Sequence, residues 1–243
     1  MEVRELTLRA ATPIVINVFN QLHYLRRMVD WLTAEKFRCI VILDNASSFP
    51  PLLDYLDRLG RSERAIVLYY GVNRGPHYFF LGGLYRQLFD DAPFLYSDPD
   101  LDVPDLSPRF LSRLFDLSRR YGVYKVGCAL TLPTTSTLKS GMALRHRDSR
   151  STSIIDWERQ YWSCPIETDV YDAPIDTTLH LFNPAHYRKG DALITGLRVA
   201  GSGFEARHLP WFKDDPCPAD ELRYYQQLTS HSTWQPTAAA TPG

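Results

Sequence analysis

Hydrophobic residues along the first half of the chain fall into two alternating patterns. Short continuous runs of apolar, largely β-branched residues have the length and composition of buried strands. Between these runs, apolar residues recur at helical spacing, and proline at the start or glycine just beyond the end punctuates several of these segments as helices. The pattern predicts strands at residues 13–19, 38–43, 65–70, 94–97 and 123–132, and helices at residues 22–32, 51–59, 77–89 and 107–121.

Strands that alternate with helices form right-handed βαβ units, in which the strands run parallel and helices cover both faces of the sheet. We therefore expect an α/β fold of the Rossmann-like kind, with a mostly parallel sheet flanked by helices. The first glycine of the chain is Gly60, so the turn after the first strand lacks the glycines of a phosphate loop or a dinucleotide fingerprint. Kinase-like NTPases and Rossmann dehydrogenases are therefore disfavoured.

The alternating pattern breaks after residue 132. A long polar segment follows, and two interpretations stay open for it: a solvated surface loop, or a lid that contacts phosphate. Further along, a helix is expected at residues 156–162 and a strand at residues 175–182, and the proline-containing stretch 214–243 is expected to be a partly disordered tail. The cationic and histidine side chains of the polar segment are Lys139, Arg145, His146, Arg147 and Arg150.

Composition and charge fit a globular protein without a nucleic-acid partner. The 243 residues are 44% hydrophobic and carry a formal net charge of -1, without the basic excess of a nucleic-acid binder. The cysteines are scattered without a C-x-x-C pair, which favours a reducing compartment over a zinc site or a disulfide framework. The sequence also lacks a signal peptide and the roughly 20-residue apolar stretch of a membrane span. We expect a soluble, cytoplasmic protein, and peripheral contact with the inner membrane stays open.

The strongest candidate site follows the fourth predicted strand. Asp98 and Asp100 flank Pro99, which holds Asp98 extended so that both carboxylates can project to the same side. Ligand sites in open α/β sheets lie beyond the carboxyl ends of strands, and paired hard oxygen ligands suit Mg²⁺ or Mn²⁺. A calcium loop would need glycine and glutamate where Val103 and Arg109 stand. A solvated acidic turn that caps the next helix is the alternative interpretation.

Polar clusters also follow the second and third predicted strands. Asp44 and Asn45 offer a carboxylate and an amide that can pair with the edge of a nucleobase. In the next cluster, Arg74 can pair with phosphate, beside Asn73 and a glycine, Gly75, that permits close approach of the backbone. Each cluster is also what an ordinary turn contains.

Taken in order, these segments resemble the inverting glycosyltransferases of family two, which have the GT-A fold. The likeness covers residues 12–130. It begins with PIVINVFNQLHYLRRMVDWL, continues through IVILDNASS and NRG, and reaches FLYSDPDLD, which looks like the metal-binding D-x-D of the family. Residues 171–178 and 206–211 look like segments of bacterial surface-polysaccharide members.

The resemblance implies a metal-dependent, inverting transferase of surface-polysaccharide synthesis. Its donor would be a nucleoside-diphosphate sugar, UDP-linked ahead of GDP-linked, and its acceptor a glycan or lipid-linked hydroxyl. It implies one GT-A domain over residues 1–213, with a nucleotide-sugar-binding half at 1–132 and an acceptor half at 133–213. The nucleotide-sugar-binding residues would be Asn20, Asp44, Asn45, Asn73, Arg74 and Asp98, with Mn²⁺ or Mg²⁺ held by Asp98 and Asp100.

Two roles fall on residues of the second half. Some GT-A enzymes use a histidine from the C-terminal region as a further metal ligand, and His208 is expected to be that ligand. The alternative is that His208 is hydrogen-bonded within a packed loop. The acidic pair that usually supplies the family's catalytic base is not found. Asp176 is expected to be the base, because partial burial at a strand entrance would raise its pKa toward the working pH, with Thr177 and Thr178 to orient it. An aspartate that ties down a turn is the alternative.

Two other functions compete with glycosyl transfer. A sugar-phosphate nucleotidyltransferase would need a glycine-rich phosphate turn after the first strand, and that turn contains no glycine. A non-catalytic module that binds nucleotides or glycans would retain Asp44 and need neither a base nor a metal.

Overall fold

The computed structural model describes residues 1–145, 151–188, 190–229 and 234–236. Its centre is a sheet whose strand order is β3-β2-β1-β4-β11-β6-β12-β10-β9. The first four of these strands are mutually parallel, β12 is parallel to β6, and β11 is inserted antiparallel between β4 and β6. The strands are β1 (Ile14–Val18), β2 (Ile40–Asp44), β3 (Ile66–Tyr69), β4 (Phe94–Ser97), β6 (Lys125–Leu130), β9 (Pro165–Glu167), β10 (Val170–Asp172), β11 (His180–Phe182) and β12 (Leu197–Val199).

Helices cover both faces of this sheet because consecutive residues of each buried strand point to opposite sides. Ile14 and Ile16 of β1 join the larger hydrophobic core, which includes residues of α2, α3 and α6. Val15 points the other way, into a cluster of aromatic side chains supplied largely by α4, α5 and β4. The helices of these layers are α1 (Val3–Ala11), α2 (Leu22–Ala34), α3 (Pro50–Arg61), α4 (Tyr78–Leu81), α5 (Leu84–Phe89) and α6 (Phe110–Tyr121).

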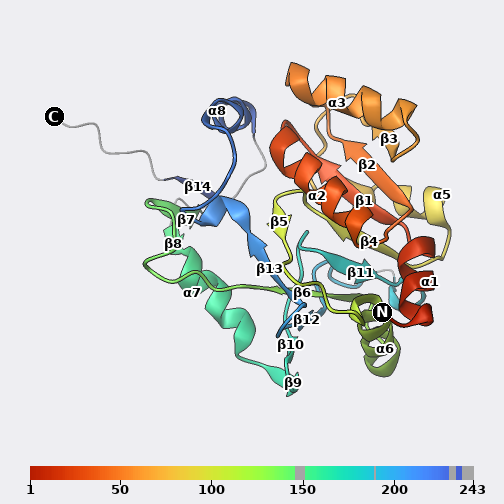
Figure 1. Ribbon diagram of the computed structural model, residues 1–243. Helices are drawn as coiled ribbons and strands as arrows, with labels where there is room; N and C mark the ends of the chain where they lie inside the picture. Colours follow the sequence, from red (N-terminus) through yellow and green to blue (C-terminus); the bar gives the residue numbers. More distant parts are fainter. Residues whose placement is uncertain (146–150, 189, 230–233, 237–243) are drawn as a thin grey trace.

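The second half of the chain extends the sheet and adds a small second sheet, ordered β14-β7-β8. Figure 1 shows α2 and α3 with β1, β2 and β3 at one side of the molecule, and α7 with β7 and β8 at the other. β13 pairs with both β5 and β6 and so returns the chain to the end of β4. These elements are β5 (Leu101–Asp102), β7 (Met142–Arg145), β8 (Ser151–Ser153), β13 (Glu205–His208), β14 (Trp234–Pro236), α7 (Ile154–Arg159), α8 (Ala219–Leu228) and the 3₁₀ turns Gln160–Trp162, Pro184–His186 and Leu209–Trp211.

The predicted fold class is confirmed, and the strands and helices of the first half lie where the pattern predicts, with the following differences. The helix expected over residues 77–89 is divided into α4 and α5, because Gly83 adopts a left-handed φ of 69°. The pattern also did not predict α1 or the two-residue strand β5. In the second half, the strand expected over residues 175–182 is confined to β11.

Part of the stretch expected to be a tail forms α8 and packs on the first half of the chain. The Glu221 carboxylate accepts the backbone N–H of His23 at 2.8 Å and so caps the start of α2. The Tyr224 hydroxyl donates to the Ser48 carbonyl at 3.0 Å. α8 therefore lies across the loops that follow β1 and β2. In the part of the chain that the structure describes, no helix is both long and apolar enough to cross a bilayer.

Candidate functional site

Asp98 and Asp100 follow β4 directly, at the carboxyl end of the parallel strands. The Asp98 backbone N–H donates to the Thr177 carbonyl at 3.1 Å, and the Thr177 hydroxyl donates back to the Asp98 carboxylate. The Asp98 side chain is thereby held against the segment that precedes β11. Asp100 is only 4% exposed, a degree of burial that is unusual for an aspartate.

The Asp100 carboxylate faces His208, which β13 carries alongside β5. His208 Nε2 lies 3.5 Å from Asp100 Oδ2, and the Gln21 amide donates to the same oxygen at 3.4 Å. The other oxygen, Oδ1, is buried and has no hydrogen-bond partner among the described residues. Burial lowers the pKa of His208, against the opposing charges of Asp100 and Asp215, so the imidazole is neutral at physiological pH and able to ligate a metal.

The Asp98 carboxyl is buried near other carboxylates, and the Thr177 hydroxyl and the Lys125 ammonium only partly oppose their effect on its pKa. Burial, followed by the charge of Asp100, raises the pKa of Asp98 well above its ordinary value, and the charge of Asp176 adds to the rise. A buried carboxylate oxygen without a partner costs free energy that a bound cation would recover. The donor set of carboxylate and neutral imidazole fits Mn²⁺ or Mg²⁺. Within the described ranges, however, no group of three or more histidine, cysteine, aspartate or glutamate side chains is already arranged to hold a metal.

Asp176 lies beside this cluster, but not in the environment that the sequence predicts. The expectation of a buried carboxylate with a raised pKa is wrong: the side chain is 65% exposed and ion-paired to His77. Desolvation favours a higher pKa, but the hydrogen bond and charge of His77, with the charges of Lys125 and Arg198, outweigh it and lower the pKa of Asp176. Thr177 bonds Asp98 rather than orienting Asp176.

Asn20 and Asp44 organise the loops at the ends of β1 and β2. The Asn20 side-chain carbonyl accepts the backbone N–H groups of Ser48 and Phe49 at 2.8 and 2.9 Å. Asp44, 2% exposed, accepts the Ser47 backbone N–H at 3.2 Å. Burial raises the pKa of Asp44, although the bonds from Ser47 oppose the rise. Both side chains thus shape the loops in which they lie.

Asn45, Asn73 and Arg74 link the ends of β2 and β3 in the same way. The Asn45 side chain accepts the Arg74 N–H at 2.8 Å, and Asn73 accepts the Gly75 N–H at 3.0 Å. The Arg74 guanidinium lies 4.6 Å from the centre of the Tyr78 ring and is exposed. The fold therefore brings the residues predicted to bind the nucleotide to one end of the sheet, with Arg74 as the exposed cation among them.

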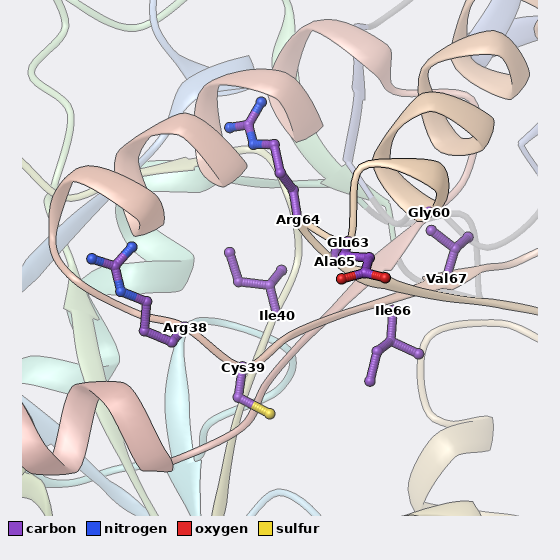
Figure 2. A pocket seen from close by; sticks show the side chains of 9 residues that line it. All are labelled: Arg38, Cys39, Ile40, Gly60, Glu63, Arg64, Ala65, Ile66 and Val67. Carbon is purple, nitrogen blue, oxygen red and sulfur yellow. The ribbon is translucent and has the colours of Figure 1, made fainter.

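A separate hollow of about 390 Å³ lies at the opposite end of the strands, between the starts of β2 and β3 (Figure 2). Ile40, Ile66 and Val67 form part of its wall, and the guanidinium of Arg64 pairs with Asp30 at 2.9 Å. Because ligand sites of open α/β sheets lie beyond the carboxyl ends of the strands, this hollow is not part of the candidate site. The polar segment, interpreted either as a surface loop or as a lid, is described only in part, since His146, Arg147 and Arg150 lie outside the described residues. Its Lys139 pairs with buried Asp215 at 3.2 Å.

Sequence reasoning missed three residues of the site: His77, Lys125 and Gln21. Lys125 is fully buried, and its ammonium donates to the Ile175 and Asp176 carbonyls at 3.1 and 3.0 Å. A lysine within the apolar run of residues 123–132 was the signal that could have identified it. Nothing in the sequence indicates that His77 meets Asp176, because the contact depends on how distant loops pack.

The comparisons with known proteins agree with this architecture. The sequence matches no protein-family model and no curated protein. A crystal structure of GalNAc-T7 with UDP, GalNAc and Mn²⁺ superposes with a TM-score of 0.53 at 12% identity, over 89% of this chain and 48% of that one. The chain has the GT-A fold. At this identity the likeness concerns the fold alone.

Two further solved structures are similar at lower scores. The mannosyltransferase PcManGT from Pyrobaculum calidifontis, in complex with GDP-Man and Mn²⁺, gives a TM-score of 0.44 at 14% identity, over 73% of this chain and 46% of that one. A UDP-glucose pyrophosphorylase complexed with UDP-glucose gives 0.39 at 13% identity, over 78% and 74%. With scores this low, neither carries weight for function. The chain spans less than half the length of either transferase.

Proposed function

We propose that the protein is a divalent-metal-dependent, inverting glycosyltransferase that moves a sugar from a nucleoside-diphosphate sugar to a glycan or lipid-linked hydroxyl. A UDP-sugar is the favoured donor, ahead of a GDP-sugar. Synthesis of a bacterial surface polysaccharide is the process that this chemistry would serve, in the cytoplasm or at the inner face of the membrane.

One observation carries the proposal: Asp98 and Asp100 follow β4 in a GT-A fold, and a buried oxygen of Asp100 has no partner among the described residues. An acidic turn whose role is only to cap a helix would expose its carboxylates to water or bond them to backbone N–H groups. The neutral imidazole of His208 beside Asp100 supports the same conclusion.

In the proposed site Asp98, Asp100 and His208 would hold Mn²⁺ or Mg²⁺. The ion supplies charge stabilisation for the departing diphosphate when bound. Asn20, Asp44, Asn45 and Asn73 shape the loops around the nucleotide, and Arg74 pairs with a phosphate oxygen. The Asp176 carboxylate accepts the proton of the acceptor hydroxyl as that oxygen attacks the anomeric carbon.

Release of nucleoside diphosphate from UDP-glucose, UDP-galactose, UDP-GlcNAc and GDP-mannose, with and without Mn²⁺, tests the proposal. We expect Mn²⁺-dependent turnover of at least one donor, and a decrease of about 10²-fold or more in the Asp98→Asn and Asp100→Asn variants. Asp102→Asn is the matched control, because Asp102 lies in the same segment but pairs with Arg27 at 3.6 Å. Binding without turnover would indicate a non-catalytic module, and equal rates in all variants would contradict the metal site.

A further inference from the structure

The contact between His77 and Asp176 joins two distant parts of the chain beside the candidate metal site. His77 Nε2 lies 3.0 Å from Asp176 Oδ1, and the side chains are 35% and 65% exposed. Among the residues that the structure describes, no other side chain bonds to this carboxylate. One oxygen of Asp176 is therefore engaged by an imidazole, while the other is available at the surface.

The backbone around Asp176 is fixed from the interior. The buried ammonium of Lys125 donates to the carbonyls of Ile175 and Asp176, and the next residue, Thr177, is bonded to Asp98 through both its hydroxyl and its carbonyl. Because these bonds fix the backbone, the Asp176 carboxylate can move only by rotation about its side-chain bonds. The contact at Oδ1 therefore sets the orientation of Oδ2.

His77 is held as firmly on its own side of the contact. Its carbonyl accepts the N–H groups of Phe80 and Leu81, each at 3.0 Å, at the start of α4. The preceding carbonyl, that of Pro76, accepts the hydroxyl of the buried Tyr96 at 2.6 Å. The ring nitrogen Nδ1 is buried and has no partner in the described part of the chain, so Nε2 is the ring nitrogen that contacts Asp176. The imidazole is thus presented to Asp176 by a loop anchored in the core.

We propose that His77 is a positioning residue that engages Oδ1 of Asp176 and leaves Oδ2 to take the proton of the acceptor hydroxyl; this inference rests on the proposed glycosyl transfer. In that step the acceptor O–H bond breaks and its proton passes to Oδ2. The acceptor oxygen forms a bond to the anomeric carbon, and the bond from that carbon to the diphosphate oxygen breaks, with its electron pair leaving on the diphosphate. The proton on Asp176 then passes to water.

Kinetics of His77→Ala, Asp176→Asn and the double variant test this role, with nucleoside diphosphate release from the fastest of the four donors as the readout. We expect His77→Ala to lower kcat about tenfold to a hundredfold while the KM for the donor stays within about twofold, since the proposed role of His77 is to position Asp176 rather than to bind the donor. The double variant should be no slower than Asp176→Asn alone, because His77 acts through Asp176. His77→Gln, which keeps a donor group, should recover part of the loss and also serves if His77→Ala fails to fold.

The control is His186→Ala, a histidine in a 3₁₀ turn after β11, which should leave kcat unchanged. A kcat for His77→Ala equal to wild type, or losses that multiply in the double variant, would overturn the role of His77 alone. A wild-type protein that releases nucleoside diphosphate from none of the donors would overturn the proposed function, and this inference with it.

Discussion

Buried charged side chains hold the molecule together at several points, and Glu5 is one of them. Its carboxylate, 1% exposed, accepts the Leu111 and Ser112 backbone N–H groups at the start of α6, each at 2.9 Å, together with the Ser112 hydroxyl and the Arg9 guanidinium. Burial would raise the pKa of Glu5, but these bonds outweigh it and lower the pKa. A single ionised residue thus fastens α1 to α6.

Glu5→Gln should therefore destabilise the protein at neutral pH by about 2–3 kcal/mol, because it removes the charge that strengthens these bonds. Since the pKa is lower in the folded state, this stability is present above the ordinary pKa of glutamate and is lost as the pH falls through the folded value. Urea unfolding of both proteins from neutral to acidic pH checks this. The difference should shrink on acidification, and Glu2→Gln, at an exposed position, should show none; a constant difference would contradict the account.

Lys125 should affect the pH dependence of stability in the alkaline range, where Glu5 has no effect. Burial lowers its pKa to about 8, although the charges of Asp176 and Asp98 oppose the shift. Above about pH 8 the unfolded chain then binds more protons than the folded one, so this residue makes the free energy of unfolding rise with pH. Urea unfolding between about pH 8 and about pH 9.5 should show a rise of at most about 1.4 kcal/mol per pH unit relative to Lys125→Met. If the free energies of unfolding of the two proteins changed with pH in parallel, the pKa of Lys125 would not be lowered by burial.

At the scale of elements, the sequence predicts well those strands and helices that local hydrophobic pattern determines. Apolar runs identify β1, β2 and β4, and helical spacing identifies the helices that follow them, without knowledge of any distant partner. The segment before β11 could not be predicted in this way. Residues 175–179 read as part of a strand, but the carbonyls of Ile175 and Asp176 are taken by the Lys125 ammonium rather than by a neighbouring strand.

The same limit applies to the candidate site. Asp98 and Asp100 could be identified because they directly follow an apolar strand, whereas the lowered pKa of Asp176 depends on His77, from a loop about 100 residues earlier. α8 was also unexpected, since a short polar helix gains its stability from packing rather than from its own pattern. Its aromatic side chains meet Phe19 and Phe49 across the loops after β1 and β2.

The docking of α8 depends on Glu221, which caps α2 from outside that helix. Glu221→Ala should lower the free energy of unfolding by about 1–2 kcal/mol, because the Glu221 side chain is buried and its loss leaves the His23 N–H without its acceptor. Chemical denaturation of this variant beside Asp220→Ala, an exposed neighbour on the same helix, provides the comparison. Equal losses in the two variants would mean that the cap contributes nothing specific.

At the scale of the whole molecule, the parallel order of β3, β2, β1 and β4 brings four loops to one end of the sheet. The loops after β1, β2 and β3 carry the predicted nucleotide residues, and the loop after β4 carries Asp98 and Asp100. The insertion of antiparallel β11 beside β4 places Asp176 and Thr177 at the same end. β13 then brings His208 from late in the sequence to Asp100. The topology thus assembles a site from segments that are far apart along the chain.

Calorimetric titration of UDP and GDP into the protein, with and without Mn²⁺, tests this site most directly. We expect at least one of them to bind more tightly, by tenfold or more, when Mn²⁺ is present, and Asp100→Asn to abolish that enhancement while Asp102→Asn preserves it. Equal affinities with and without the metal, or an enhancement that survives in Asp100→Asn, would contradict a metal–diphosphate site at the end of β4.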